Sequence, residues 1–524
     1  MRTIVGWMLA VLVCGTVSAQ DPWEVAIKNG AQTQEGIRFC DHFTWGWLSH
    51  VDPITGLIPR NLNRDWWWNA KDSAADNYPF MVLTARMTGN HHLREVTRRM
   101  LETERAKTNR VDVLPDDYDF AKQGFRTEEI DMDSLIFGAS EYSKDGLMPI
   151  SEWIGPSPWF DRMEEMINSI WNHAKVETPF GNIPSDSVEV NGELLQTMSR
   201  LYWKNRDERM KSRLFRLADY YLLEKDLMEE DSIRLDDHGC EVIGGLSEAY
   251  YIASKEDPKR HAEYKPKMHR ILDRVLEVGA NVDGLLYNRV NPKTGEIQDD
   301  DLTDNWGYNY NAFLLVSQID EEPRYREAVE KVLSNIHKYL DFQWERGSAD
   351  GYADSIEGGI NLSNRIPTES ALQWIDDSMK ILLAKQQPDG IIEGWHGDGN
   401  GARTTLMWVL LKTQGVTVSP WTEDLQVGAT LDDQGALYLV LKNNWKWRGE
   451  IQFDRPRHRE FFNMPSDYPR LNEFPEWFVV EEKVQYRVEI EGEEPKMLIG
   501  ESLRHLKREM EPESELRIKI SRVD

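Results

Sequence analysis

Cysteine is scarce in this chain, with three residues among 524. Cys14 lies in the apolar N-terminal stretch, so Cys40 and Cys240 are the cysteines that a processed protein keeps. Two cysteines can form one disulfide in an oxidising compartment, or stay buried as small hydrophobic side chains. Their spacing matches no zinc-binding pattern, and we expect neither a metal ion nor a cofactor.

Long hydrophobic runs are also missing beyond the N-terminus. The chain begins "MRTIVGWMLAVLVCGTVSAQ", in which Arg2 precedes an apolar core and the small residues around Ala19 fit a cleavage site. This pattern predicts a signal peptide over residues 1–19, and Val13 before Cys14 is too bulky for a lipoprotein signal. No later stretch reaches the 18 or so apolar residues of a membrane span. We therefore expect a secreted or periplasmic protein with no membrane span.

Basic residues are outnumbered, with 62 Lys and Arg against 90 Asp and Glu and a net charge of −28. Phosphate backbones repel such a chain, so nucleic acid is not an expected partner. Tryptophan is abundant instead, with 20 residues. Its flat face either packs in a core or stacks on flat ligands such as sugar rings.

Helical periodicity dominates from about residue 24 to residue 414. Long, charged stretches alternate with shorter ones that are richer in small and aromatic residues, which indicates outer helices with one wet face and inner helices buried nearly all round. A repeat of roughly 50–60 residues built from one helix of each kind predicts a ring or solenoid of helical hairpins. The stretch 369–386 also reads as a helix, without a clear partner.

The pattern changes near residue 416. "GALYLVLKN" and four later segments alternate apolar and polar residues, as strands do. The sequence thus divides into a signal peptide (1–19), a helical catalytic domain (20–415) and a β-rich C-terminal domain (416–524) that we expect to be a sandwich.

This organisation resembles the six-hairpin (α/α) toroid glycosidases and their polysaccharide-lyase relatives. About six helical hairpins, acid- and aromatic-rich loops before the inner helices, a signal peptide and a C-terminal β domain carry the resemblance. It implies a mainly α protein, an (α/α)6-type toroid followed by a β-sandwich-like domain. It also implies an active site in the ring mouth, at the N-terminal ends of the inner helices.

Acidic residues gather where those helices are expected to begin. Each can be a helix cap, because the helix N-terminus stabilises carboxylates. Hydrolysis of a glycosidic bond, however, needs two carboxyl groups across the scissile bond. We expect Asp304 to be the general acid, since neighbouring aromatic rings would desolvate it and raise its pKa. The candidates for the second carboxylate are Asp237, Glu241 and Asp398.

Aromatic, amide and basic side chains in the same loops are candidates for binding a sugar. They are Trp68, Asp76, Asn77, His238, Trp306, Tyr308, Tyr310, His396 and Arg403. In "WHGDGNGARTT" three glycines stand at a helix start, and a backbone approached closely by a ligand would explain them. "DGYADSIEGGINLSNR" adds Asp354 and Glu357 in an expected long loop.

Two further functions use the same residues. A polysaccharide lyase would neutralise a uronic-acid carboxylate with an Asn, His or Arg side chain and take a proton with a Tyr or a His. Tyr308, Tyr310, His238, His396, Asn77 and Arg403 are the candidates for those roles. A non-catalytic glycan-binding protein would need only the aromatic groove. A glycoside hydrolase acting on an oligo- or polysaccharide is the function we expect first.

Overall fold

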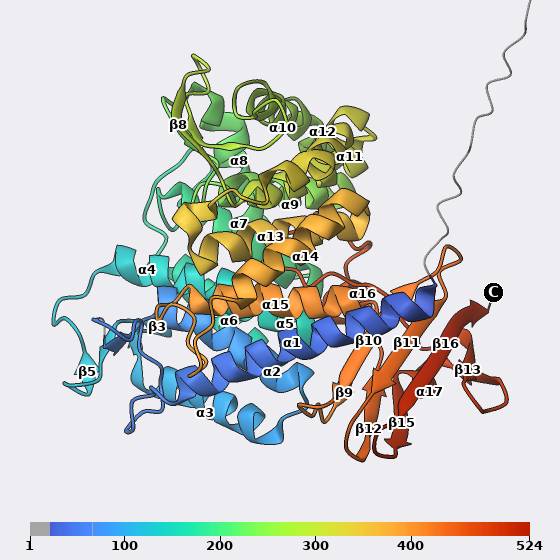
Figure 1. Cartoon of the computed structure of the whole chain (residues 1–524). Helices are drawn as coiled ribbons and strands as arrows, with labels where there is room; N and C mark the ends of the chain where they lie inside the picture. The colour runs from blue at the N-terminus through green and yellow to red at the C-terminus, as the bar shows by residue number, and fades with distance from the viewer. Residues whose placement is uncertain (1–20, 65, 524) are drawn as a thin grey trace, which may run out of the picture.

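The computed structural model describes residues 21–64 and 66–523, so the expected signal peptide lies outside the described residues. Helices fill the chain as far as Thr413, and strands follow from Thr417 (Figure 1). Among the described residues, no helix has both the length and the apolar character that crossing a bilayer demands.

Within the described residues, seven helical hairpins form the helical part, each with one outer and one inner helix. The outer helices are α1 (Pro22–Leu48), α3 (His91–Lys107), α6 (Pro158–Asn172), α8 (Glu208–Asp219), α10 (Pro258–Val278), α12 (Pro323–Asn335) and α14 (Glu369–Leu383). The inner helices are α2 (Tyr78–Met87), α4 (Met132–Glu141) continued by α5 (Met148–Ile154), α7 (Val188–Asn205), α9 (Glu241–Glu256), α11 (Trp306–Asp320), α13 (Ala349–Arg365) and α15 (Asp398–Thr413).

Two inner helices contain a turn of π-helix. The segment η1 (Ala70–Asn77) leads into α2, and η2 (Tyr142–Leu147) joins α4 to α5. The two π segments pack against each other. π-helical turns are rare and occur often at functional sites.

The inner helices contact one another in sequence order, and α15 contacts both η1 and α2, so the first and last hairpins close a ring. The toroid expected from the sequence is confirmed. It has one hairpin more than the six that the sequence pattern indicated, because α13 is the inner helix that follows α12 and the stretch 369–386, expected without a partner, is the outer helix α14 before α15.

Helix α13 is the element that sequence reasoning missed, since its segment was expected to be a long loop. Ser348 caps it by accepting the N–H of Gly351. The glycines that make the segment loop-like serve helix packing. A Cβ on Gly307 of α11 would lie 2.2 Å from the Cα of Gly358, so only glycine allows this crossing of α11 and α13.

The C-terminal domain is a sandwich of two antiparallel sheets. Its strands are β9 (Thr417–Ser419), β10 (Gln426–Leu431), β11 (Leu437–Lys442), β12 (Trp447–Gln452), β13 (Gln485–Ile490), β14 (Lys496–Ile499), β15 (His505–Met510) and β16 (Glu515–Val523). One sheet has the order β10-β11-β16-β13-β14 and the other β15-β12-β9. A separate apolar cluster fills the space between them.

Short strands also occur in loops of the ring, as β1 (Trp67–Trp68), β2 (Asn109–Val111), β3 (Leu114–Pro115), β4 (Tyr118–Asp119), β5 (Gly124–Phe125), β6 (Ile233–Arg234), β7 (Tyr287–Val290) and β8 (Ile297–Leu302). Cys40 and Cys240 are both buried free thiols. The structure therefore has the buried alternative rather than a disulfide.

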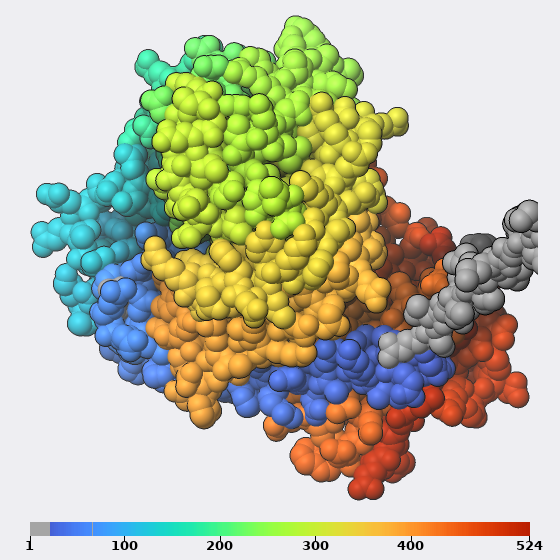
Figure 2. All heavy atoms as spheres, turned by 45° about the horizontal axis from the view of Figure 1, so that its top comes forward, coloured from blue at the N-terminus to red at the C-terminus, as the bar shows by residue number. Residues whose placement is uncertain are grey.

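Helix α1 joins the two domains by packing along β10, and Figure 2 shows it between the helical body and the C-terminal strands. The amide of Asn29 donates to the carbonyl of Ala429 at 2.8 Å, and the hydroxyl of Thr33 donates to that of Val427 at 2.5 Å. A Cβ on Gly428 would lie 2.1 Å from the carbonyl oxygen of Ala26, so a side chain there would push the sheet away.

Residues 457–478 leave the sandwich and enter the end of the ring opposite the inner-helix N-termini. We call them the plug. They begin with the short helix α16 (Arg457–Phe462). Phe462, Met464, Tyr468 and Phe474 belong to the hydrophobic core of the ring, not to that of the sandwich. The plug therefore belongs in sequence to the C-terminal domain, residues 416–524, but packs in the core of the helical domain.

Buried ion pairs fix the plug. Arg470 binds Glu152 through two hydrogen bonds of 2.9 Å, and Arg200 contacts the same carboxylate at 3.2 Å. Arg200 also pairs with Glu248, and the side chains of Glu152 and Arg200 have no exposed surface. Burial alone would raise the pKa of Glu152, but Arg470 and Arg200 outweigh it and hold that pKa below its usual range.

Removing Arg470 should therefore destabilise the fold strongly. Arg470→Met keeps the aliphatic stem but leaves part of a buried carboxylate uncompensated, at a cost of about 3–5 kcal/mol. We expect a clearly lower urea midpoint by circular dichroism. Arg326→Ala, which breaks an exposed pair with Glu330 on α12, should stay within about 0.5 kcal/mol of the parent. Equal midpoints for both variants would show that the plug does not need this pair.

Candidate active site

A cavity of about 390 Å³ lies at the N-terminal ends of the inner helices. All seven inner-helix sectors contribute to it. Its wall consists of Arg60, Lys71, Asp72, Asp76, Phe137, Glu141, Lys144, Asp145, Glu189, Asp237, His238, Tyr308, Glu345, Asp350, Asp354, Trp395, His396, Asn400 and Arg403. A volume in this range suits a small ligand.

Asp72 on η1 is held as an anion. Asn69 and Arg60 both donate to its Oδ2, the latter at 2.5 Å, and Nε2 of His396 lies 3.3 Å from Oδ1. Burial alone would raise the pKa of Asp72. The charge of His396 and the bonds from Asn69 and Arg60 outweigh that effect and lower it.

Asp76, four residues further along η1, has the opposite environment. Its half-buried carboxyl group makes no hydrogen bond with any described residue. Burial and the nearby charges of Asp145, Asp72 and Asp350 raise its pKa well above the usual range. A group that keeps its proton at neutral pH can act as a general acid.

The glycines of "WHGDGNGARTT" position Asp76. A Cβ on Gly399 would lie 2.2 Å from the carbonyl oxygen of Asp76 and 2.6 Å from Cα of Asn77. Gly399 is therefore needed because α15 packs directly on the backbone of η1. This explains the glycine without the close approach of a ligand that the sequence analysis expected there.

Asp145 on η2 is a second ionised carboxylate. Lys144 lies 2.8 Å from Oδ1, and the amide of Asn472, from the plug, donates to the same oxygen at 2.9 Å. Burial would raise the pKa of Asp145, but Lys144, Glu141 and Asn472 lower it overall. The plug thus reaches the floor of the cavity.

Below Asp145 the carboxylates outnumber the cations. Glu141, Asp145 and Glu193 have carboxylate oxygens within 4.8 Å of one another. Lys144 also pairs with Glu241 at 2.5 Å. Burial, together with Glu193 and Asp145, raises the pKa of Glu141, and burial likewise raises that of Glu193. The positive charge of Lys144 is shared by Asp145 and Glu241. Glu141 and Glu193 therefore favour their protonated forms.

Arg403 of α15 organises the opposite wall. Its guanidinium pairs with Asp354 and, at 2.7 Å, with Glu357, and it donates to the Tyr308 hydroxyl at 2.9 Å. Tyr308 in turn donates to Glu357 at 2.6 Å. Burial is the main cause that raises the pKa of Tyr308 well above its usual range. The tyrosine is a hydrogen-bond donor here, not a base.

Asp350 begins α13 beside this wall. Its carboxylate accepts one hydrogen bond, from the amide of Asn400 at 2.7 Å. Burial and the charges of Asp354 and Glu345 raise its pKa well above the usual range. Asp350 therefore joins Asp76 and Glu141 among the cavity carboxyl groups whose surroundings favour the protonated form.

His238 at the rim is held as a cation. Nδ1 contacts Glu189, and Nε2 lies 3.1 Å from Asp237. Burial would lower its pKa, but Glu189 and Asp237 raise it to about 9. The residue has a left-handed backbone, with φ +67°.

The predicted binding residues divide into two groups. Asp76, His238, Tyr308, His396 and Arg403 line the cavity. The others do not, and they are Trp68, Asn77, Trp306 and Tyr310. Trp306 donates to Ser355 in the core, and Tyr310 donates to the carbonyl of Gly284. Trp68 and Asn77 are buried. These four were wrongly expected to face a ligand, because helical spacing does not show how deep a residue lies.

Of the four expected catalytic acids, only Asp237 lines the cavity. Asp304 is half-buried outside the wall and accepts the N–H of Asn305 at 3.0 Å. Its pKa is raised, as expected, by burial first and then by the charges of Asp354 and Glu345. Glu241 is buried and bound to Lys144 and Gln196.

Asp398 is a structural residue, which corrects its assignment as a catalytic candidate. It is fully buried and accepts backbone N–H groups of Ile392, Glu393 and Gly394 at 2.7–3.2 Å. The indole of Trp47 donates to it as well, at 3.1 Å. A carboxylate with every oxygen occupied by donors holds the loop in place and is not available for proton transfer.

Sequence reasoning did not single out Lys144, Asp145, Glu189, Asp350 or Asn472. Lys144 and Asp145 lie inside a helical run, and the Asp145–Gly146 pair that follows is typical of a turn and not of a functional site. The sign that could have found them is their charge in an otherwise buried helix, because buried charged residues need partners from other elements. Asp350 was hidden in the segment read as a loop.

Asp72, Asp76 and His396 also bring possible ligand atoms within 4.8 Å of one another. A metal ion there would have to compete with Arg60 and Asn69, which already donate to Asp72. The guanidinium repels a cation, so this arrangement suits hydrogen bonding to a neutral ligand better than metal binding.

No family model matches the chain, and no curated protein matches it. Solved structures of low similarity do match. A cellobiose 2-epimerase from Spirochaeta thermophila is 12% identical, with 58% of this chain and 83% of that chain covered and a TM-score of 0.40. A family 76 glycoside hydrolase (mannosidase) from Bacteroides thetaiotaomicron is also 12% identical. The match covers 72% of this chain and 98% of that chain, with a TM-score of 0.40.

An unsaturated glucuronyl hydrolase from Bacillus sp. GL1 is 12% identical, covers 53% of this chain and 86% of that chain, and has a TM-score of 0.37. Scores and identities this low carry no argument about activity. The chemistry of this chain rests on its own residues.

The charge of His238 can be measured directly. Since its folded pKa is about 9 and the unfolded value is about 6.5, the stability it contributes is complete below the unfolded pKa and is lost as pH rises through the folded one. NMR of labelled histidine should find the imidazolium intact at neutral pH, with assignment by His238→Gln. Glu189→Gln should lower the pKa, and an unchanged value in that variant would contradict this pairing.

Proposed function

We propose that this protein is a carbohydrate-active enzyme, and more narrowly a glycoside hydrolase. One observation carries the proposal. Asp76 and Asp145 stand on the two packed π-helical segments at the cavity, and their surroundings move the two pKa values apart, Asp76 upward and Asp145 downward. Pairs of carboxyl groups separated in this way are the acid and base of glycoside hydrolysis.

Each carboxyl group has a defined part in the reaction. Asp76 gives its proton to the leaving glycosidic oxygen as the bond to the anomeric carbon breaks. Asp145 provides the negative charge opposite, either by taking a proton from the attacking water or by attacking the carbon itself. Lys144 and Asn472 keep Asp145 ionised and fixed in place.

The remaining wall supplies contacts for sugar hydroxyl groups. Asn400 and Arg403 are donors, and Asp72 and Asp354 are acceptors. Phe137 and Trp395 are half-exposed rings in the same wall, on which a sugar face can stack. The expected secretion would place such an enzyme where external glycans occur, and this remains part of the proposal.

The same site offers fewer bases for β-elimination than the sequence suggested. A lyase needs a base that is unprotonated near neutral pH, but Tyr308 has a strongly raised pKa and His238 is protonated. His396 is the remaining candidate base in the wall, because burial lowers its pKa. The lyase alternative predicts products with ultraviolet absorbance from a conjugated uronate, whereas hydrolysis gives none.

Asp76→Asn should separate acid catalysis from binding. On glycosides with poor leaving groups we expect kcat/KM to fall by about 10²–10⁴, the usual contribution of a general acid. Dinitrophenyl glycosides, which need no protonation, should lose far less. The exposed Asp300 on β8 provides the control Asp300→Asn, which should match the wild type. A loss that is equal for both leaving groups, or a larger loss in Asp304→Asn, would refute the assignment.

Asn472 allows a matched test of the plug. Asn472 and Asn463 both have left-handed backbones, with φ +55° and +58°, but only Asn472 bonds to Asp145. Glycine tolerates this backbone while removing the amide. Asn472→Gly should raise the pKa of Asp145 and move the acidic limb of the pH profile of kcat/KM to higher pH. Asn463→Gly should leave the profile unchanged, and identical profiles would rule out this role.

A further inference from the structure

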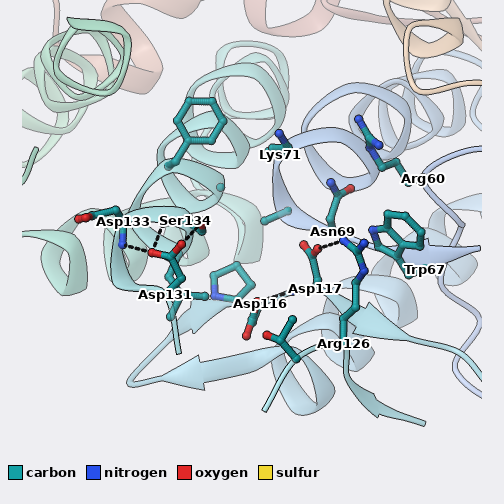
Figure 3. A pocket seen from close by; sticks show the side chains of 16 residues that line it. Arg60, Trp67, Asn69, Lys71, Asp116, Asp117, Arg126, Asp131, Asp133 and Ser134 are labelled. Atoms are coloured by element: carbon teal, nitrogen blue, oxygen red, sulfur yellow. Dashed lines mark hydrogen bonds and ion pairs between the residues drawn. The ribbon is translucent and has the colours of Figure 1, made fainter. Parts of the chain in front are cut away.

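A second cleft adjoins the cavity. It has a volume of about 540 Å³ and is lined by η1, by the start of α4 and by the insertion that contains β4 and β5 (Figure 3). The insertion is held by pairing of β4 with β1, where Trp67 is opposite Asp119 and Trp68 opposite Tyr118. Arg60, Lys71 and Phe137 line both the cleft and the cavity, so the two spaces meet at these residues.

Nearly every charged side chain in the cleft already has a partner. Asp117 pairs with Arg126 at 3.2 Å, and Asp133 pairs with Lys175 at 2.7 Å. Asp131 caps α4 by accepting from the backbone and hydroxyl of Ser134.

The same holds at the two ends of the cleft. Asp116 lies 3.8 Å from Arg110, and Arg60 pairs with Asp72. The charged side chains of these pairs neutralise one another within the protein and are not available to neutralise a charged ligand.

Lys71 differs from them. Among the described residues it has no carboxylate within ion-pair distance, although the chain carries 90 acids. Its ammonium lies 5.3 Å from the centre of the Phe137 ring. The residue is exposed and lines both the cleft and the cavity. An exposed ammonium that no carboxylate neutralises, held over the face of an aromatic ring, suits an anionic group on a sugar that lies beside that ring.

We infer that the cleft binds the sugar units next to the cleaved bond, and that Lys71 binds a carboxylate or sulfate on one of them. The inference rests on the proposed function. It narrows the substrate class to an acidic oligosaccharide longer than the cavity alone can hold. Trp67, whose ring is covered by Arg126 at 3.9 Å, also lines the cleft.

Binding should be measured by calorimetry in the Asp76→Asn background, so that the ligand is not consumed. The probes are uronate tetrasaccharides with their carboxyl-reduced forms, and sulfated tetrasaccharides with their desulfated forms. We expect at least one charged form to bind about ten-fold more tightly than its neutral counterpart, the effect of one charge-assisted hydrogen bond. The two pairs of probes distinguish carboxylate from sulfate.

Adding Lys71→Ala should abolish that preference and leave the neutral forms unaffected, while Lys71→Arg should keep most of it. Lys331→Ala, an exposed lysine on α12, is the control and should change nothing. Equal binding of charged and neutral chains, a preference that survives Lys71→Ala, or no binding at all would overturn the inference.

Turnover of neutral and acidic chains by the wild type distinguishes a failure of the Lys71 inference from a failure of the proposed hydrolase function. Hydrolysis of neutral chains by the wild type without any acidic preference would refute the role of Lys71 and leave the hydrolase. A preference for acidic chains that depends on Lys71, without hydrolysis by the wild type, would support the cleft and refute the hydrolase.

Discussion

The buried pairing of Arg470 with Glu152 is the interaction on which the rest of the structure depends. It anchors a segment of the C-terminal half inside the helical ring, and Arg200 and Glu248 extend it across neighbouring inner helices. Desolvating these charges is costly, so the arrangement is stable only when all partners are present. Since the same segment carries Asn472 to Asp145, the pairing that closes the ring also sets the geometry of the cavity floor. The β domain is therefore part of the site and not an appendage.

The cavity is best understood as a balance of charge. Nine carboxyl groups and five basic side chains, counting His238, surround one space together with His396. Cations hold Asp72 and Asp145 ionised and pair with Glu189 and Asp354, whereas burial leaves Asp76, Asp350 and Glu141 favouring their protons. The site thus contains donors and acceptors side by side without a large net charge. Such an arrangement can move a proton across a bond, and it is the physical basis of the proposed hydrolysis.

Periodicity predicted much of this fold, because outer helices with one wet face and inner helices without one leave clear patterns. It failed for α13, whose paired glycines are typical of loops but here permit contact with α11. Within the site, residues at helix starts such as Asp76 and Arg403 could be predicted, since parallel inner helices bring their N-termini together. Asp145 and Asn472 could not, because a mid-helix acid and a loop 327 residues away meet only in three dimensions. Asp398 shows the converse error, in which a helix-start acid serves its own loop.

The proposed reaction adds water across a glycosidic bond in this cavity. The test is to incubate the wild-type protein with oligosaccharides in ¹⁸O-labelled water and to measure the masses of the products by mass spectrometry. Hydrolysis predicts one ¹⁸O atom at the new reducing end and none in the other product. Asp76→Asn should form neither product from a substrate with a poor leaving group. An unlabelled, ultraviolet-absorbing product from the wild type would show elimination instead and would contradict the account.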